Sequence, residues 1–434
     1  MPMETHPVLQ LTKRFGVVVG ALAAALSVGH AARAADIFSK DTFSGLADIR
    51  AAVADGEASW LDGGFGKLRF GSNTGKLDGH VALADAALVW KPRLTWDLGA
   101  VVDGEVQRGD GERYGVDLIQ AYLTYKPVPH GSTRFSARAG LYYPEISLEH
   151  GGAEWSVTDT ITPSAINTWV GEEVKVVGGE VTVSHAFGEQ ELAATGGVFT
   201  YNDTSGTLLT FRGWAMHDLK AGATGDYALP PLERSYLIGQ PPETYPLREI
   251  DSRVGYYAEL EWRPTGRASL SAFYYDNRGN LVGVDAQHQW AWATRFWNFS
   301  GRVMLDDRTE LKSQVMTGDT LMGFPNGRSV WFNVGYTSAY VSMTHSLGRS
   351  GVMGRFDYFE TRDRNYRPAT DDVDENWGEK GWALTGGYHV ALNPHAKLFL
   401  EALHIQSNRP TRLQARIPPK QFQTLVQSSL RLTF

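Results

Sequence analysis

The chain has 434 residues, of which 42% are hydrophobic and 12% aromatic, and this composition excludes a disordered protein. The formal charge of -7 at pH 7 is mildly acidic and argues against nucleic acid as a partner. The sequence contains no cysteine, so no disulfide can stabilise the fold. The length fits either two or three soluble domains or one large barrel.

The first element in chain order is a secretory signal over residues 1–34. A basic pair precedes the apolar run 15–29, and the sequence ARA at 32–34 follows with the A-x-A form of a cleavage site. A membrane anchor would need about 20 apolar residues, more than this run provides. We therefore expect an exported mature chain, 35–434, and export without disulfides fits the bacterial periplasm or outer membrane.

Seven short turn signals divide the mature chain into hairpins. Each joins two segments in which apolar and polar residues alternate, and Pro, Gly or Asp supplies the turn dihedrals. The turns lie at residues 90–96, 126–135, 186–192, 262–270, 305–311, 346–352 and 392–398. Longer polar stretches separate one hairpin from the next, so the sequence predicts seven hairpins joined by long loops.

One further strand at each end brings the expected total to sixteen. The first covers 46–54, and the last covers 421–434, where the alternation continues to the final residue, Phe434. Short turns at one rim and long loops at the other are typical of outer-membrane barrels, in which the short turns face the periplasm. The sequence therefore predicts an all-β fold, a 16-stranded antiparallel transmembrane β-barrel with short periplasmic turns and long outer loops.

The two faces of the expected strands agree with a barrel in lipid. In segments such as 135–141, apolar residues alternate with polar ones, so one set can face lipid and the other a wet lumen. A soluble sandwich would need a linker or second layer that we do not find, and lipid does not tolerate open sheet edges. Aromatic residues also gather beside the turns and the loops, as rings do at the two membrane interfaces.

The export signal, the alternating strands and the terminal segment SSLRLTF together resemble bacterial outer-membrane porins. More loosely, the layout resembles the phosphate-selective porin O and P superfamily, although the lysines and the arginine ladder behind that specificity are not visible. The resemblance implies that Phe434 belongs to the signal read by the barrel-assembly machinery. It further implies a bacterial cell outer-membrane location, contact with lipid and lipopolysaccharide, and a homotrimer.

A barrel of sixteen strands leaves an aqueous channel for small hydrophilic solutes or ions. The loop 143–173 follows the fifth expected strand, where the resemblance to porins implies a constriction loop that folds into the lumen. It contains no Lys or Arg and six carboxylates: Glu145, Glu149, Glu154, Asp159, Glu172 and Glu173. Carboxylates in a narrow passage attract cations, so we expect passive diffusion with weak cation selectivity.

Inward-facing side chains of the strands form the expected pore wall. By alternation these include Arg50, Asp97, Arg138, Glu259, Arg355, Asp357 and Arg431. The wall arginines could offset the loop carboxylates, so a phosphate- or anion-selective porin remains an alternative. The largest outer loop, 202–250, is expected to cap the mouth, and an extra strand pair that would give eighteen strands remains open.

Other candidate sites carry weaker signals. Three carboxylates of one outer loop, Asp371, Asp372 and Asp374, could hold a divalent cation, but a solvated acidic loop is the simpler interpretation. No cofactor is expected. A lipid-hydrolysing barrel would need a Ser–His pair, yet neighbours such as Ser184 and His185 point to opposite faces of a strand. A structural or adhesive barrel is the remaining alternative.

Overall fold

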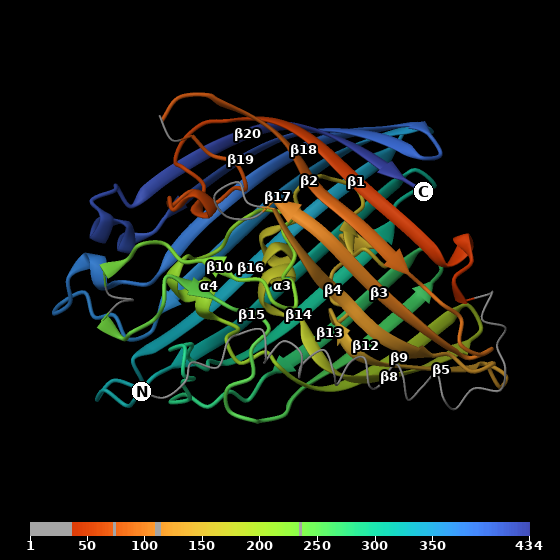
Figure 1. Cartoon of the computed structure of the whole chain (residues 1–434), viewed down its shortest axis with the longest axis horizontal. Coiled ribbons are helices and arrows are strands. Elements are labelled where there is room, and N and C mark those ends of the chain that lie inside the picture. Colours follow the sequence, from red (N-terminus) through yellow and green to blue (C-terminus); the bar gives the residue numbers. More distant parts are fainter. Residues whose placement is uncertain (1–36, 73–74, 109–113, 234–236) are drawn as a thin grey trace, which may run out of the picture.

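The computed structural model describes residues 37–72, 75–108, 114–233 and 237–434, and the expected signal segment 1–34 lies outside them. Sixteen strands form one closed antiparallel barrel (Figure 1), which confirms the predicted fold class. Strands that follow one another along the barrel pair side by side all the way round. The eighteen-strand alternative is therefore wrong, since the sheet closes with sixteen.

The strand boundaries follow the predicted alternation closely. The barrel strands are β1 (Phe43–Ala54), β2 (Asp78–Trp90), β3 (Leu98–Arg108), β4 (Tyr114–Tyr125), β5 (Thr133–Tyr142), β8 (Val176–Phe187), β9 (Gln190–Thr200), β12 (Gly255–Thr265), β13 (Ala268–Asp276), β14 (Ala293–Met304), β15 (Thr309–Met322), β16 (Phe332–Ser346), β17 (Ser350–Asp363), β18 (Glu379–Asn393), β19 (Ala396–Asn408) and β20 (Lys420–Thr433). All seven predicted turns join neighbouring strands of this list, and long loops lie at the other end of the barrel (Figure 1).

The last strand closes the barrel against the first. Leu46 of β1 pairs with Thr433 of β20, and the antiparallel register continues to the pair of Ala54 with Leu425. Beyond the strand, the backbone of Phe434 exchanges hydrogen bonds with Gly45 at 3.2 and 3.3 Å. Strand β20 thus supplies the final edge of the sheet, and closure leaves no unpaired edge in lipid.

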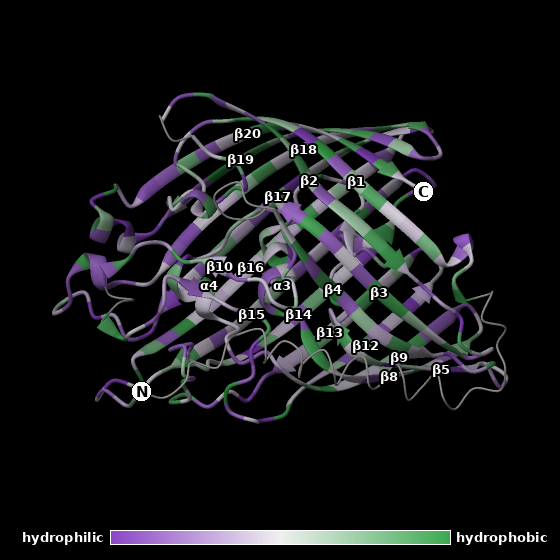
Figure 2. Ribbon diagram, in the orientation of Figure 1, coloured by the Kyte–Doolittle hydropathy of each residue, from purple (hydrophilic) through white to green (hydrophobic). Residues whose placement is uncertain are grey.

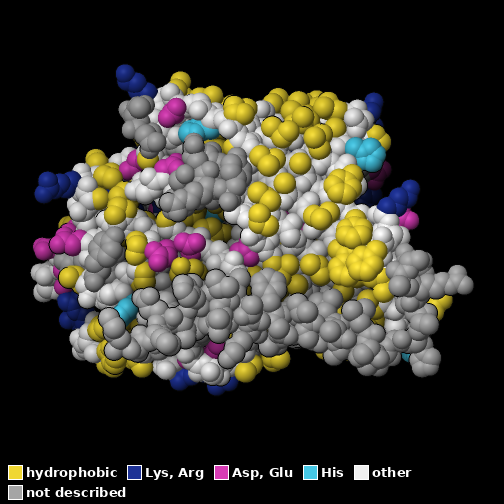
Figure 3. Space-filling model, viewed as in Figure 1, with side chains coloured by type: hydrophobic (Ala, Val, Ile, Leu, Met, Phe, Trp, Pro, Cys, Tyr) yellow, Lys and Arg dark blue, Asp and Glu magenta, His cyan; other side chains and the backbone are white. Residues whose placement is uncertain are grey.

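The outer surface of the barrel is apolar. Alternation of hydrophilic and hydrophobic residues is visible along the strands (Figure 2), and the outward positions of the strands carry exposed large hydrophobic side chains such as Val81, Leu260 and Phe356. Hydrophobic side chains gather over the barrel wall, whereas charged ones lie mainly toward the two ends (Figure 3). Such a surface suits a lipid environment. Within the described residues, no helix is long and apolar enough to cross a membrane.

The barrel interior contains packed loop segments with two short α-helices, α3 (Ala165–Glu173) and α4 (Thr207–Phe211). Figure 1 shows α3 within the barrel and α4 nearer the long-loop end. Every residue of both helices is buried. The loops also form two small hairpin sheets, β6 (His150–Gly151) with β7 (Ser156–Val157), and β10 (Tyr227–Ala228) with β11 (Glu243–Thr244). Among the described residues of loop 202–250, none joins the barrel sheet, and a large part folds inward.

Candidate channel interior

The loop between β5 and β8, residues 143–175, crosses the lumen. Glu401 on β19 accepts a hydrogen bond from the backbone N–H of Ile161 at 2.8 Å. Arg431 on β20 donates to the carbonyl of Thr160 at 3.2 Å. Because β19 and β20 are far from β5 and β8 in the barrel order, these contacts tie the loop to the opposite wall.

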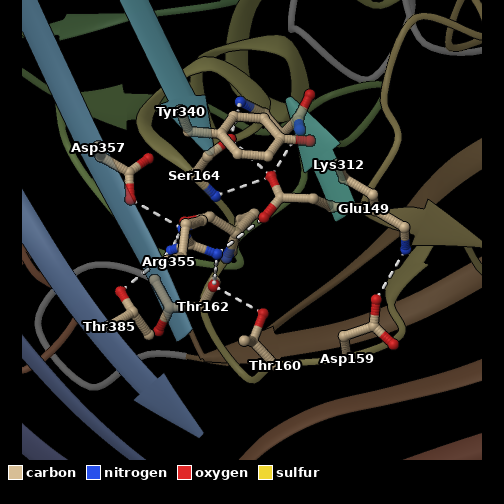
Figure 4. Close-up of polar contacts among 12 residues, drawn as sticks. Glu149, Asp159, Thr160, Thr162, Ser164, Lys312, Tyr340, Arg355, Asp357 and Thr385 are labelled. Carbon is tan, nitrogen blue, oxygen red and sulfur yellow. Dashed lines mark hydrogen bonds and ion pairs between the residues drawn. The ribbon is translucent and has the colours of Figure 1, made fainter. Parts of the chain in front are cut away.

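Arg355 on β17 makes the most extensive attachment of this loop (Figure 4). Its guanidinium contacts Glu149 at 2.7 Å, donates to the carbonyl of Thr162 at 3.0 Å and pairs with Asp357 at 2.8 Å. The other carboxylate oxygen of Glu149 accepts from the backbone N–H of Ser164 at 2.9 Å. Arg355 therefore holds two separate parts of the loop, one at Glu149 and one at Thr162, and the carboxylates of Glu149 and Asp357 balance its charge.

Helix α3 begins at a conventional cap and packs against an aromatic wall. Ser164 is the N-cap, and its side chain accepts a hydrogen bond from the backbone N–H of the third helical residue. Trp169 lies 5.4 Å from the rings of both Phe296 on β14 and Tyr336 on β16. Inward-facing aromatics thus serve as the surface on which the loop docks.

The last two residues of α3 are carboxylates with opposite electrostatic surroundings. Burial would raise the pKa of Glu172, but the Arg212 guanidinium and His217 lower it to about 2. For Glu173, burial raises the pKa to about 7, although the backbone N–H of Leu208 donates to it at 3.0 Å. Glu172 is therefore an ionised partner of a cation, whereas Glu173 sits near half-protonation at neutral pH.

A second internal segment, residues 214–223, also crosses the lumen, and we call it the strap. At one end the backbone N–H of Trp214 donates to Glu379 on β18 at 3.0 Å. At the other end the N–H of Ala223 donates to the carbonyl of Leu118 on β4 at 2.9 Å. The strap belongs to loop 202–250, so this loop enters the barrel, and its role as a cap over the mouth stays a prediction.

Charged side chains in the middle of the strap are paired with the wall. Asp218 contacts Arg50 on β1 at 2.7 Å and Arg69 at 2.8 Å. Burial would raise the pKa of Asp218, but these two arginines hold it well below its usual range. Lys220 pairs with Glu105 on β3. Sequence reasoning missed the strap because its only sign was partial alternation within an irregular loop.

The first long loop, residues 55–77, packs against the strap. The Lys67 ammonium lies 2.5 Å from Glu379 and donates to the carbonyl of Trp214 at 2.8 Å. Its own carbonyl accepts from the N–H of Met216 at 2.8 Å. Burial lowers the pKa of Lys67 to about 7, even though Glu379 favours the charged form. Three loops therefore meet inside the barrel.

A cavity of about 680 Å³ remains between loop 143–175 and the wall, on the short-turn side. Arg138 on β5 lies 2.9 Å from Glu180 and 3.2 Å from Glu145, whose side chain is 80% exposed. Glu259 on β12 also lines the cavity and forms no ion pair among the described residues; the Ser271 hydroxyl is its hydrogen-bond partner. The cavity is polar and carries negative charge that its cations do not fully balance.

The six predicted loop carboxylates are distributed unevenly. Glu145 faces the cavity, and Glu154 is half-buried with its backbone carbonyl bound by Lys220 at 2.9 Å. The other four have partners inside the barrel, including Lys312 for Asp159 at 2.7 Å: Glu149, Asp159, Glu172 and Glu173. Their role as a constriction remains a prediction.

Six of the seven predicted wall residues lie on barrel strands and take part in the interior contacts: Arg50, Arg138, Glu259, Arg355, Asp357 and Arg431. Asp97 does not. It lies in the turn before β3, which begins at Leu98, and its carboxylate accepts from the Thr95 hydroxyl at 2.6 Å. Alternation was extended too far into the turn, because Asp–Thr hydrogen bonding favours turn geometry there.

The predicted metal candidates do not gather. Asp371, in the loop between β17 and β18, forms an ion pair at 2.6 Å with Arg328, in the loop between β15 and β16. Among the described residues, the carboxylates close enough to share an ion are Asp203, Glu249 and Asp251. These groups accept backbone N–H donors of their own loop, for example Ile250 N–H on Asp203 and Ser252 N–H on Glu249, which is a turn-stabilising role.

A closed 16-stranded barrel with an apolar outer surface and a polar interior defines a bacterial outer-membrane protein with a porin-like fold. Among solved structures, the chain is similar to the outer membrane channel DcaP of Acinetobacter baumannii, with a TM-score of 0.54, 13% identity, and coverage of 91% of this chain and 99% of that one. It is also similar to the anion-selective porin from Comamonas acidovorans, with a TM-score of 0.50, 11% identity, and coverage of 91% and 99%. No family model matches the sequence, and no curated protein matches it.

Proposed function

We propose that the chain is an outer-membrane porin, a water-filled channel for passive diffusion of small hydrophilic solutes and ions. The observation that carries this proposal is the polar cavity of about 680 Å³ between loop 143–175 and the barrel wall. The opposite side of the lumen is taken up by the loop's attachments to β17, β19 and β20. Solutes therefore pass between the loop and strands β5 to β14, and residues 143–173 form the constriction.

The pore is proposed to be weakly cation-selective. Exposed Glu145 and Glu259, which has no ion pair within the described part of the chain, face the cavity, while Arg138 offsets part of their charge. Two unit charges about 4 Å apart interact by roughly 1 kcal/mol in water and about 4 kcal/mol near a protein surface. Such energies bias permeation several-fold and fade as salt screens the carboxylates.

The second candidate is a phosphate- or anion-selective porin. It is favoured by a group of three arginines that face the lumen at the β1–β20 seam: Arg50, Arg69 and Arg431. Asp48 and Asp218 balance most of that charge, so we prefer the cation-selective form. A purely structural barrel would conduct no ions.

Reversal potential in planar bilayers with a KCl gradient separates these functions. The wild type should favour K⁺ weakly, and the double variant Glu145→Gln, Glu259→Gln should move the reversal potential toward Cl⁻. Asp372→Asn, an exposed change on an outer loop, is the matched control and should leave it unchanged. A strongly anion-selective wild type would favour the second candidate, and a barrel without conductance would reject the channel.

The proposal also includes a homotrimer in contact with outer-membrane lipid and lipopolysaccharide and inserted by the barrel-assembly machinery. A shallow apolar hollow on the outer wall supports a subunit contact, because small residues there let another chain approach closely: Ala51, Gly386, Ala402 and Ser428. Native mass spectrometry of the detergent-solubilised protein should give three copies. A monomer would contradict the trimer without affecting the channel.

A further inference from the structure

The barrel wall behind the strap carries two charged groups of opposite sign on neighbouring strands. The basic subsite consists of Arg50 on β1, Arg69 on loop 55–77 and Arg431 on β20. The acidic subsite consists of Asp85 on β2 and Asp103 and Glu105 on β3. Strands β20, β1, β2 and β3 are consecutive in the barrel, so the two subsites lie side by side on one wall.

Asp218 of the strap occupies the basic subsite. Its carboxylate accepts from two nitrogens of Arg50 at 3.0 and 2.7 Å and from Arg69 at 2.8 Å. This fork geometry is how arginines recognise free carboxylates. The remaining carboxylate here is Asp48, which contacts Arg50 at 2.7 Å and Arg431 at 3.2 Å. Without the strap, three guanidinium groups would face one carboxylate, a net charge of +2.

Lys220 of the strap occupies the acidic subsite. Its ammonium pairs with Asp85 at 3.1 Å and with Glu105. The other ammonium near these carboxylates, Lys175, donates to backbone carbonyls. Without the strap, Asp85 and Glu105 would lose the ammonium with which they pair, and the subsite would remain acidic. Asp103 is fully buried, and neither of its oxygens has a hydrogen-bond partner among the described residues, so the subsite retains unused acceptors.

We propose that the two subsites bind a zwitterionic solute of the short-peptide class and that the strap is its built-in competitor. Asp218 and Lys220 are two residues apart in a non-helical segment, which separates their Cα atoms by up to about 7 Å. A short peptide with free termini carries a carboxylate and an ammonium over a comparable span. This inference rests on the proposed channel, because the solute must enter the lumen to reach the wall.

The ion pairs of Asp218 and Lys220 are contacts that a solute can replace. Met216 and Leu219 are buried in the interior apolar clusters, and backbone hydrogen bonds attach the strap to its neighbours. The charged side chains of Asp218 and Lys220 are attached through ion pairs. Buried ion pairs contribute little net stability against alternatives that satisfy the same charges. A peptide that supplies one carboxylate and one ammonium therefore replaces these two side chains in the subsites, and its apparent affinity falls by the fraction of time that the two side chains are bound there.

Calorimetric titration of the full chain in detergent with triglycine at low ionic strength tests this directly. The wild type should bind triglycine, and N-acetyl-triglycine or triglycine amide, each lacking one charge, should bind about tenfold more weakly or worse. The variant Asp218→Asn, Lys220→Met removes the competitor and should bind triglycine about tenfold more tightly. Arg253→Gln, an exposed change between loop 202–250 and β12, is the control and should not alter the affinity.

Equal binding of the capped peptides, or an unchanged affinity in the strap variant, would overturn the proposal. Hydrogen exchange on the wild type gives a second measurement that needs no folded variant: triglycine should increase exchange at amides 215–222, and unchanged or slower exchange there would also overturn it. KCl conductance is measured separately. A channel that conducts but ignores triglycine rejects only the zwitterion site, whereas a barrel without conductance rejects the porin.

Discussion

The Arg212 guanidinium donates through both of its terminal nitrogens to the two carboxylate oxygens of Glu172, and so joins loop 202–250 to helix α3. Both side chains are almost fully buried, and His217 of the strap contacts the same carboxylate at 2.6 Å. Helix α3 and the strap are therefore coupled, and a substitution at Arg212 or Glu172 should destabilise the packing of both segments.

Glu172→Gln should loosen both segments inside the barrel. Removal of one partner leaves a buried, uncompensated guanidinium, which typically costs about 3–5 kcal/mol. We expect larger and noisier single-channel currents. The matched control is Glu173→Gln on the same helix, which should change the currents little because Glu173, with a pKa of about 7, is half-neutral at neutral pH. Equal effects of the two variants would contradict the coupling.

Acid should release the same contact. The pKa of Glu172 is lowered to about 2 in the folded chain, below the ordinary 4.5, by Arg212 and His217 acting against burial. A lowered carboxyl pKa stabilises the fold above the ordinary value, and this contribution is lost as pH falls from about 4.5 through about 2. The pKa of neighbouring Glu173 is shifted in the opposite direction, to about 7. Its contribution to the stability of the fold is complete below pH 4.5 and is lost as pH rises through about 7.

Hydrogen exchange in α3 as a function of pH measures these two effects after correction for intrinsic rates. Glu172→Gln should abolish the loss of protection at the acid end, and Glu173→Gln should abolish the loss near pH 7. Protection that falls with acid to the same extent in wild type and Glu172→Gln would disagree with the assignment.

Trp169→Ala should undock α3 without opening the barrel. The indole is 1% exposed and packs between Phe296 and Tyr336, so its removal leaves a cavity worth about 3–5 kcal/mol. The strand pairings do not involve this side chain, so heat-modifiable migration on gels should persist while exchange at 161–173 rises. Trp96→Ala, at a turn position 97% exposed, is the control.

Deletion of Phe434 should impair assembly but not export. The residue is 72% exposed, and its backbone pairs with Gly45 at the seam where β20 meets β1. Loss of heat-modifiable, membrane-inserted protein is expected, with export unchanged. Deletion of the exposed turn residue Gly348 serves as the control for loss of one residue. Wild-type levels of inserted protein after removal of Phe434 would contradict this role.

Single cysteines test the orientation of the barrel, and the chain has none of its own. If the short turns are periplasmic, a membrane-impermeant maleimide should label Asp372→Cys on intact cells but not Gly348→Cys or Gly266→Cys. All three positions are exposed, so access depends on the side of the membrane. Labelling of Gly348→Cys on intact cells would invert the orientation.

The sequence alone determined the barrel. Alternation with a period of two shows which face of a strand is apolar, and Pro, Gly and Asp mark where the chain turns; both signals are local. They were sufficient for the sixteen strands, the seven turns and the closing strand at 421–434. The error at Asp97 came from the least certain part of such reasoning, the exact end of a strand.

Only the tertiary structure decided how the lumen is filled. Alternation placed Arg50 and Arg355 on the inner face, but it could not identify Asp218, 168 residues away, or Glu149, 206 residues away, as their partners. Such pairs depend on which strands become neighbours after closure and on loops that gain more from burying aromatic and charged groups inside the barrel than from hydration outside it. Charge pairing over these separations leaves no periodic trace in the sequence, because the free energy that selects it arises only when the closed wall excludes water.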